Sequence, residues 1–435
     1  MATYTEFQGV VLAGGYGSRM LDLSDEVAKP LLPVATVPMF WYALNTLRNN
    51  NIFDVLLITN DKCIQEIKSL LANEYLFPEL RIEVVSPGPV GEQWGTLEVI
   101  RHFADRIRHD FIVFSGDVVS DLNLTPMLQF HRAEDSTLTV LLADNIINAD
   151  KDNVVPGVKV VKNVPKYRDY TIISVDESTN NRLLFMTPEE DFEEMKPKHQ
   201  LFIKFPHVNL TSRFYNCHIY VMKRGLLNVV KSCDSSLFSL TAEFIPYILQ
   251  QQFGKPDQHI NDMIFGHAEK KDEDLVDYAA QEQKFSLIDN VEEIRCFAFK
   301  ATADSGTMIA RCNTVGAYFE ANRFVQQTPS LFFKPDMITQ LGIGKKISGA
   351  DARSSIDETA GIGNSTRIVG SVVMKNATIN NKCIIKDSII CPGAVIGDEC
   401  QIVSSIVGTE EAVQSKERLT ETVQKCEREM EMDDD

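Results

Sequence analysis

The chain has 435 residues, of which 44% are hydrophobic, so it is long enough for two domains that each bury a core. Its 43 basic and 61 acidic residues give a formal net charge of −18, which argues against nucleic acid or an anionic membrane as the main partner. Nine scattered cysteines without a Cys-x-x-Cys pair indicate neither a disulfide framework nor a zinc site. The start of the chain lacks the features of a signal peptide, and no apolar run approaches the roughly 18 residues of a membrane helix, so we expect a cytosolic protein.

Near the N-terminus, a short apolar run ends in a glycine-rich turn. Val10 to Ala13 predicts a buried strand that stops abruptly, and the glycines after it leave room for a ligand. Backbone N–H groups of such a turn can face a phosphate, and Arg19 and Lys29 add two cations that can hold phosphate oxygens. Spacing alone leaves an ordinary strand–turn–helix connection equally open. The glycines of the turn are Gly14, Gly15 and Gly17.

Strands and helices alternate after this turn, which predicts a mainly parallel sheet covered on both faces. Ligands bind such sheets at the carboxyl ends of the strands, so the glycine turn and Asp117, which both follow strands, are expected to face one crevice. A carboxylate there can hold Mg²⁺, and a turn-capping aspartate is the alternative. The predicted strands are 53–59, 81–85, 111–114 and 138–142, and the predicted helices are 38–50, 62–71 and 96–107.

The residues of the turn resemble a family signature. Leu12 to Met20, followed by Lys29 to Val34, resembles the signature of the sugar-phosphate nucleotidyltransferases, which join a nucleoside triphosphate to a sugar 1-phosphate and release pyrophosphate. The resemblance implies that the loop cradles a nucleotide, that the cations hold phosphates and that a glycine–threonine pair meets the nucleobase. The implied nucleotide-binding residues are Gly14, Gly15, Gly17, Arg19, Lys29, Gly95 and Thr96, and the implied metal ligand is Asp117.

The motifs for the sugar half of that site fit badly. Active members carry a lysine that grips the sugar phosphate, and the matching position here is Thr187, whose hydroxyl is a weak replacement. His218, in Asn216 to Tyr220, puts an imidazole where the family has no side chain; a packing role is the alternative to a metal or catalytic one. Ala28 replaces the proline of the family's Pro-Lys pair. We therefore expect no catalytic residues.

From Ser354 the sequence repeats every 17 residues. Each unit carries three β-branched apolar residues at steps of six, six and five, which fits a three-sided coil with one inward side chain per face. A single coil cannot bury its apolar row, so the coils must stack. The pattern resembles hexapeptide left-handed β-helices, from which the handedness is taken. The repeated apolar positions are Ile356, Ile362, Ile368, Val373, Ile379, Ile385, Ile390, Ile396, Ile402, Val407 and Val413.

Together these features predict an α/β protein with three parts. We expect a Rossmann-like nucleotidyltransferase domain with a mainly parallel sheet over residues 1–330, a left-handed parallel β-helix over 331–416 and an acidic tail over 417–435. Residues 416–431 have a helix-compatible composition, and the charged stretches 189–199 and 268–284 are typical of surface loops.

This domain order occurs in GDP-mannose and ADP-glucose pyrophosphorylases and in two subunits of the guanine-nucleotide exchange factor for eukaryotic translation initiation factor two. Asn313 to Arg323 resembles a stretch typical of the gamma-subunit family of that factor, and Glu243 to Tyr247 points the same way. The epsilon subunit has a further helical domain that performs exchange, for which we expect no room after the repeat. The alternative is a working pyrophosphorylase that forms GDP-mannose.

The gamma-subunit resemblance implies a non-catalytic scaffold that promotes exchange of GDP for GTP. The implied partners are the epsilon subunit directly, the alpha, beta and delta subunits of the same complex, and translation initiation factor two, with no direct nucleic acid and no membrane. No cofactor is implied as a requirement. A nucleotide with Mg²⁺ in the vestigial site remains open.

Overall fold

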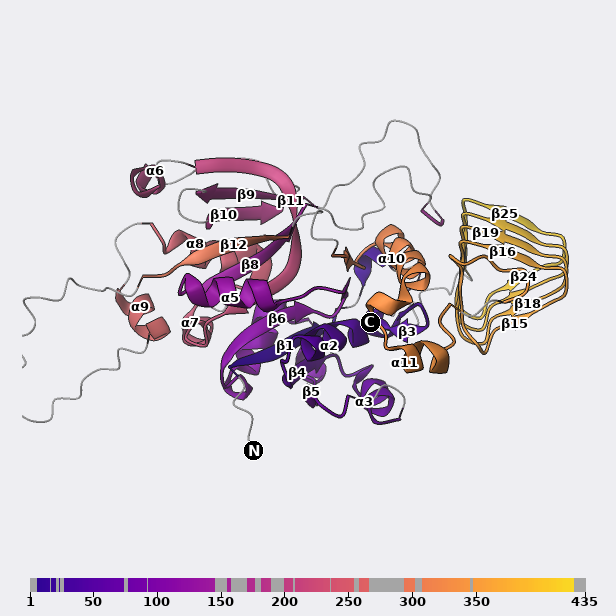
Figure 1. Ribbon diagram of the computed structural model, residues 1–435, viewed down its shortest axis with the longest axis horizontal. Helices are drawn as coiled ribbons and strands as arrows, with labels where there is room; N and C mark the ends of the chain where they lie inside the picture. Colours follow the sequence, from indigo (N-terminus) through magenta and orange to yellow (C-terminus); the bar gives the residue numbers. More distant parts are fainter. Residues whose placement is uncertain are drawn as a thin grey trace, which may run out of the picture.

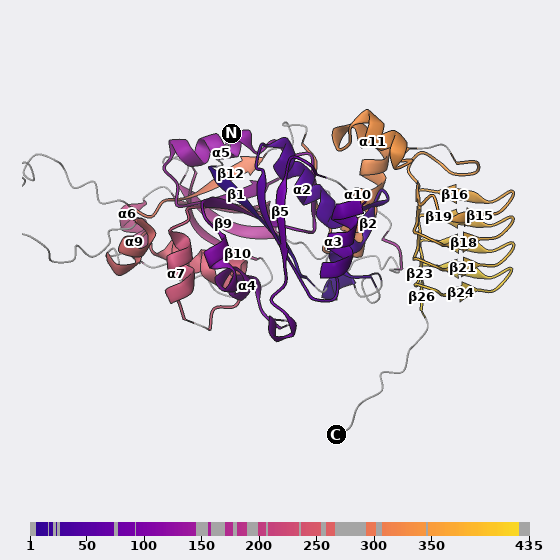
Figure 2. The same ribbon diagram turned by 90° about the horizontal axis from the view of Figure 1, so that it is seen from below.

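The computed structural model places two regions side by side, a sheet domain and a stack of short strands at one end of the molecule (Figures 1 and 2). No helix in the described part of the chain is long and apolar enough to cross a membrane. The described residues are 6–15, 17–20, 23, 27–73, 77–91, 93–144, 155–157, 170–176, 181–188, 199–205, 208–234, 236–253, 258–265, 293–301, 307–344 and 347–425.

The first region is built on a nine-stranded sheet in the order β5-β4-β1-β6-β11-β8-β12-β10-β9 (Figure 1). The half that contains the predicted glycine turn is parallel, with β1 between β4 and β6. β11 runs antiparallel to both β6 and β8, whereas β12 is parallel to β8. The strands are β1 (Phe7–Ala13), β4 (Asp54–Thr59), β5 (Arg81–Val85), β6 (Asp110–Ser115), β8 (Leu138–Ala143), β9 (Tyr170–Asp176), β10 (Arg182–Pro188), β11 (Val208–Met222) and β12 (Cys296–Ala301).

Helices cover both faces of this sheet, as the alternation predicted. Successive side chains of a strand point to opposite faces. Val11 accordingly joins the core formed with α2 (Met39–Asn49), and Val10 joins the core on the other face with α4 (Thr96–His102). The predicted helix 96–107 ends at His102, where a separate 3₁₀ turn, Ala104–Arg106, follows. The other helices are α3 (Ile64–Asn73), α5 (Thr125–Ala133), α6 (His199–Lys204), α7 (Leu226–Ser232), α8 (Ile245–Gln250), α9 (Gln258–Phe265), α10 (Val315–Gln327) and α11 (Pro335–Gln340).

Two small sheets complete the first region. The hairpin β2 (Pro33–Val34) and β3 (Val37–Pro38) leads into α2. β7 (Val118–Ser120) pairs antiparallel with β13 (Ile309–Arg311), which brings a late segment of the chain against the end of β6.

The second region is a solenoid of three parallel sheets, and this arrangement is consistent with a left-handed β-helix. Each strand pairs with the strand one repeat later, so Ile368, Ile385 and Ile402 stack in register. The predicted inward row is confirmed: Ile379, Ile385 and Ile396 are at most 1% exposed. The three sheets are β14 (Ser355–Ile356), β17 (Val372–Val373), β20 (Ile389–Ile390), β23 (Ile406–Val407) and β26 (Val423–Gln424); β15 (Gly361–Ile362), β18 (Thr378–Ile379), β21 (Val395–Ile396) and β24 (Ala412–Val413); and β16 (Arg367–Val369), β19 (Ile384–Lys386), β22 (Gln401–Val403) and β25 (Arg418–Thr420).

The limits of the solenoid differ from the prediction at both ends. Its ladders begin at Ser355, apart from one bridge at Ala350, and residues 335–340 form helix α11, so the start at 331 is wrong. β25 and β26 extend the stack to Gln424, so the boundary at 416 is also wrong, and both strands lie within the stretch whose composition is helix-compatible. Leu419, one repeat after Ile402, continues the inward row without being β-branched, which hid it from the pattern. Residues 189–198, 268–284 and 426–435, which hold most of the predicted loops and tail, lie outside the described residues.

One sheet of the solenoid packs against the first region. Its outward-facing Val372, Ile389 and Ile406 are at most 3% exposed and belong to the same core as α2 and α10. Arg323 of α10 donates to the Gly370 carbonyl at 3.1 Å and also pairs with Asp387. The two regions therefore share one apolar interface with an ionic contact at its edge.

Candidate functional site

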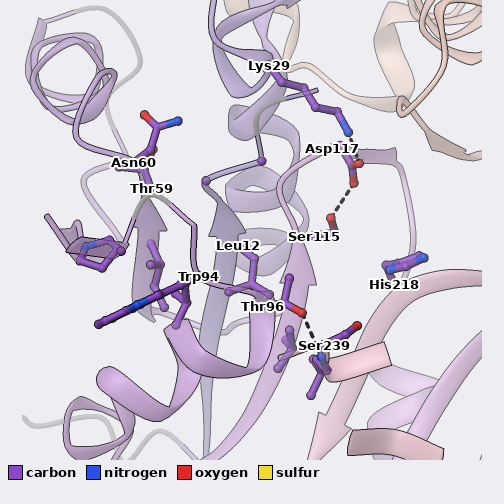
Figure 3. Close-up of a pocket in the computed structure, with 18 of the residues that line it drawn as sticks. Leu12, Lys29, Thr59, Asn60, Trp94, Thr96, Ser115, Asp117, His218 and Ser239 are labelled. Carbon is purple, nitrogen blue, oxygen red and sulfur yellow. Dashed lines mark hydrogen bonds and ion pairs between the residues drawn. The ribbon is translucent and has the colours of Figure 1, made fainter. Parts of the chain in front are cut away.

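A cleft of about 660 Å³ opens at the carboxyl ends of β1, β4 and β6 (Figure 3). This is the edge at which the alternating pattern predicted a ligand site. Gly14 and Gly15 from the turn after β1 line it, together with Thr59 at the end of β4 and Ser115 at the end of β6. The cleft has a charged end around Asp117 and an apolar end around Trp94, which lie apart in Figure 3.

The charged end is organised by Asp117, whose side chain is 10% exposed. Lys29 Nζ donates to Asp117 Oδ2 at 2.5 Å, and Ser115 Oγ donates to Oδ1 at 2.6 Å. Arg311 Nε lies 3.8 Å from Oδ2. Both carboxylate oxygens thus already have partners within the chain.

Local structure fixes these partners. Lys29 begins a 3₁₀ turn, Lys29–Leu31, whose Pro30 and Leu31 are buried and anchor it. Arg311 is placed by the pairing of β13 with β7, which sets it opposite Val118, beside Asp117. The Cys312 N–H also donates to the Asp117 carbonyl at 2.8 Å. Sequence reasoning missed Arg311 because it follows Asp117 by nearly two hundred residues and belongs to no local motif.

The electrostatics of this end keep Asp117 ionised. Burial acts to raise the pKa of the carboxyl, but the Lys29 and Arg311 charges and the hydrogen bonds from Lys29 and Ser115 outweigh it. The pKa of Asp117 is therefore held well below its usual range.

His218 lines the same cleft from β11. Its φ is 54°, and the pairing of β11 with β8 shifts register between Asn216 and Tyr220, so the histidine sits on a bulge. The His218 N–H donates to Asn216 Oδ1 at 3.0 Å, which holds the bulge. Burial, followed by the charge of Arg311, lowers the pKa of His218 well below its ordinary value, so the imidazole is neutral.

The glycine turn takes the predicted place, with one addition. Gly17 has φ 71°, and its carbonyl accepts from the Met20 N–H at 2.7 Å, closing the 3₁₀ turn Ser18–Met20. Arg19 within that turn is exposed. Gly116 was not predicted: a Cβ there would lie 3.0 Å from the Leu12 carbonyl oxygen, so a side chain would push the turn after β6 slightly away from β1.

The Gly95–Thr96 pair is engaged by the protein itself. A Cβ on Gly95 would lie 2.2 Å from the Phe238 carbonyl, and the Leu97 N–H donates to that same carbonyl at 2.9 Å. Thr96 lines the cleft, but its hydroxyl accepts from the Leu240 N–H at 3.0 Å (Figure 3). The pair therefore joins the start of α4 to the segment 238–240, and base recognition stays a prediction.

Apart from Leu12, the first residue of the glycine signature, the apolar lining comes from side chains that the motifs did not single out. Trp94 lines the cleft, as do Val99 of α4 and Val113 of β6. Asn60, directly after β4, adds an amide. A flat aromatic group fits such a wall, because aromatic side chains and planar ligands bury large areas in parallel or edge contacts.

The donor set does not fit a resident divalent cation. Within the described residues, no group of three or more His, Cys, Asp or Glu side chains could hold a metal. Mg²⁺ needs oxygen ligands that are available to it, and the two oxygens of Asp117 are taken by Lys29 and Ser115. We therefore derive no chemistry through a metal here.

Thr187, the predicted replacement of the sugar-phosphate lysine, lies on β10 opposite Ile172 of β9. β10 and β9 are antiparallel, and β9 also pairs with β11. Of the predicted nucleotide-binding residues, the structure thus gathers Gly14, Gly15, Lys29 and Thr96 around the cleft that also holds Asp117.

Comparisons with known proteins agree with this geometry. Residues 8–151, which include β1, β4 and β6, match the nucleotidyl transferase family. Mannose-1-phosphate guanylyltransferase from Mycobacterium tuberculosis is 33% identical over 144 residues, which is 33% of this chain and 38% of that enzyme. This likeness is confined to part of each chain.

A second kind of relative matches over a longer stretch. Translation initiation factor eIF2B subunit gamma from Dictyostelium discoideum is 24% identical over 339 residues, 74% of this chain and 75% of the relative. The protein of the same name from Caenorhabditis elegans is 32% identical over 331 residues, 74% of this chain and 69% of the relative. This extent and identity show that the chain belongs to the family of eIF2B gamma subunits.

Proposed function

We propose that the chain is a non-catalytic subunit of a complex that exchanges GDP for GTP on translation initiation factor two. The observation that carries this proposal is the similarity to gamma subunits over 331 residues, which extends well beyond the 8–151 region shared with nucleotidyl transferases. If the chain shared only its fold with nucleotidyl transferases, no similarity to gamma subunits would be expected outside residues 8–151.

The cleft supports a role without turnover. Thr187 offers no charge to a sugar phosphate, and Asp117 is bound by Lys29 rather than presented to a metal. His218 occupies the cleft as a neutral imidazole. The side chains around Asp117 thus contact one another instead of presenting acids, bases and metal ligands to a substrate.

The proposed partners are those of the family resemblance. The epsilon subunit pairs with this chain directly, the alpha, beta and delta subunits complete the complex, and translation initiation factor two is the target, all in the cytosol. The net charge of −18 suits docking to proteins rather than to nucleic acid. An obligate interface with epsilon should bury something like 2,000 Å² or more.

The test is release of fluorescent GDP from translation initiation factor two. Three samples are compared: this chain alone, epsilon alone, and both after co-purification. We expect no release by this chain alone and faster release by the pair than by epsilon alone. Robust release by this chain alone, or failure to co-purify with epsilon, would contradict the proposal.

The alternative function is a GDP-mannose-forming pyrophosphorylase, and the observation that supports it is the 33% identity to the mycobacterial guanylyltransferase.

Either function is compatible with a bound nucleotide, and we infer that the cleft retains the capacity to bind one through Gly14, Gly15 and Lys29. The volume of about 660 Å³ lies in the range of small-molecule sites and suits a nucleotide.

A further inference from the structure

The ion pair of Lys29 and Asp117 changes what the cleft can take. An aspartate that coordinates a metal needs carboxylate oxygens that are accessible to the metal. Here the Asp117 side chain is 10% exposed, the Lys29 side chain is 12% exposed, and their atoms meet at 2.5 Å. The carboxylate is buried against a cation of its own chain.

Two cations meet Asp117 at this end. Lys29 Nζ lies 2.5 Å and Arg311 Nε lies 3.8 Å from its carboxylate. His218 adds no charge because it is neutral. A phosphate that enters here finds two cations beside Asp117, whereas a divalent cation would meet their repulsion.

We propose that Asp117 is an internal counter-charge and that the cleft binds an organic phosphate of nucleotide size without Mg²⁺. The phosphate lies against Lys29 and Arg311, in partial exchange for Asp117, and the planar ring lies against Trp94. This inference rests on the retained nucleotide capacity proposed above, and it is independent of whether the chain supports guanine-nucleotide exchange.

The two roles of Asp117 predict opposite effects of one substitution. If the carboxylate held a metal, Asp117→Asn would weaken nucleotide binding. As a counter-charge, the carboxylate competes with the ligand's phosphate for the same two cations. Its removal takes away the charge that competes with the phosphate, so Asp117→Asn tightens binding, on the order of tenfold. Lys29→Met weakens binding by a similar factor, because it removes one of the two cations.

The experiment titrates the full chain with GTP by calorimetry, once with excess EDTA and once with excess Mg²⁺. The proposal requires binding in EDTA at least as tight as in Mg²⁺. Loss of about tenfold or more in affinity on removing Mg²⁺ would overturn it, and so would the absence of GTP binding in both conditions. This arm uses only the natural chain, so it stands even if a variant fails to fold.

The variants are read against a matched pair on the surface. Lys231 and Asp105 also meet at 2.5 Å, but both side chains are exposed. Lys231→Met and Asp105→Asn should leave GTP affinity unchanged. Weaker binding by a folded Asp117→Asn chain would refute the counter-charge role, whereas the GDP-release assay with epsilon would be unaffected by that outcome.

Discussion

The interior of the solenoid and the charged end of the cleft are both closed to solvent, but they are built on opposite principles. In the solenoid, Ile385 is fully buried among apolar neighbours that repeat from coil to coil. In the cleft, Asp117 is buried among charged and polar groups that occur once in the chain. Stability in the first region is therefore spread over equivalent positions, whereas in the second it depends on a few specific pairs.

A polar ladder also follows the repeat. Ser371, Ser388 and Ser405 each donate a backbone N–H to the hydroxyl of the serine one coil earlier, at 3.1 to 3.3 Å. Each hydroxyl in turn donates to a carbonyl two residues before it. This serine ladder thus satisfies its buried polar groups locally, coil by coil. The cleft has no such redundancy.

The largest effect is expected inside the solenoid. Ile385→Asp places a charge among apolar side chains with no cation to pair with, and should cost several kcal/mol, about 4 or more. Ile384→Asp is the matched control, because Ile384 is adjacent to Ile385 on the same strand and is 46% exposed. We expect a change within about 0.5 kcal/mol for the control. Chemical denaturation of the full chain measures both, and equal losses would show that the inward row is not the stabilising element.

The next effect is expected where the two regions meet. Arg323 lies 3.0 Å from Glu320, pairs with Asp387 and covers the Phe319 ring at 4.3 Å. Arg323→Met removes the cation that joins the nearly buried carboxylates of Glu320 and Asp387, leaves Asp387 only the more distant Lys386, and should cost about 3 kcal/mol. The exposed pair of Arg353 with Asp351 provides the control, Arg353→Met, with an expected loss below about 1 kcal/mol. A loss no larger than that of the control would mean that apolar packing alone joins the regions.

A smaller effect is expected from pH, because a buried histidine of the sheet domain should make the free energy of unfolding depend on pH. Burial, followed by the charge of Lys223, lowers the pKa of His131 in the sheet domain to about 4. The unfolded chain binds a proton on this histidine below its ordinary pKa of about 6.5, while the folded chain does not until about pH 4. Stability therefore falls as pH decreases through that window, by about 2 kcal/mol between pH 7 and pH 5.

The check is denaturant unfolding of the natural chain and of His131→Gln at pH 7 and pH 5. The variant should lose about 2 kcal/mol less than the natural chain between these values. His259→Gln, at an exposed position of α9, is the control and should retain the full dependence. An unchanged dependence in His131→Gln would exclude this histidine as the cause.

The same contrast explains which features the sequence could predict. The solenoid row and the strand before Gly14 are local and periodic, so their pattern identified them. The pairing of Arg311 with Asp117 depends on β13 meeting β7, which no local spacing records. The last coil was missed because Leu419 broke the β-branched pattern while keeping its place in the stack. The bulge at His218 likewise arises from strand pairing, not from its own residue type.

The proposed function requires that the cleft keeps the nucleotide end of a nucleotidyl transferase but not its chemistry. The deciding measurement is pyrophosphate release by the full chain with GTP, mannose 1-phosphate and Mg²⁺, and with ATP and UTP and their sugar 1-phosphates in parallel. A GDP-mannose-forming enzyme assayed under the same conditions confirms that turnover is detectable. We predict no release above the protein-free blank, because Thr187 offers no charge to the sugar phosphate and Lys29 already holds Asp117. Turnover near the median of about 10 s⁻¹ for enzymes would contradict the account.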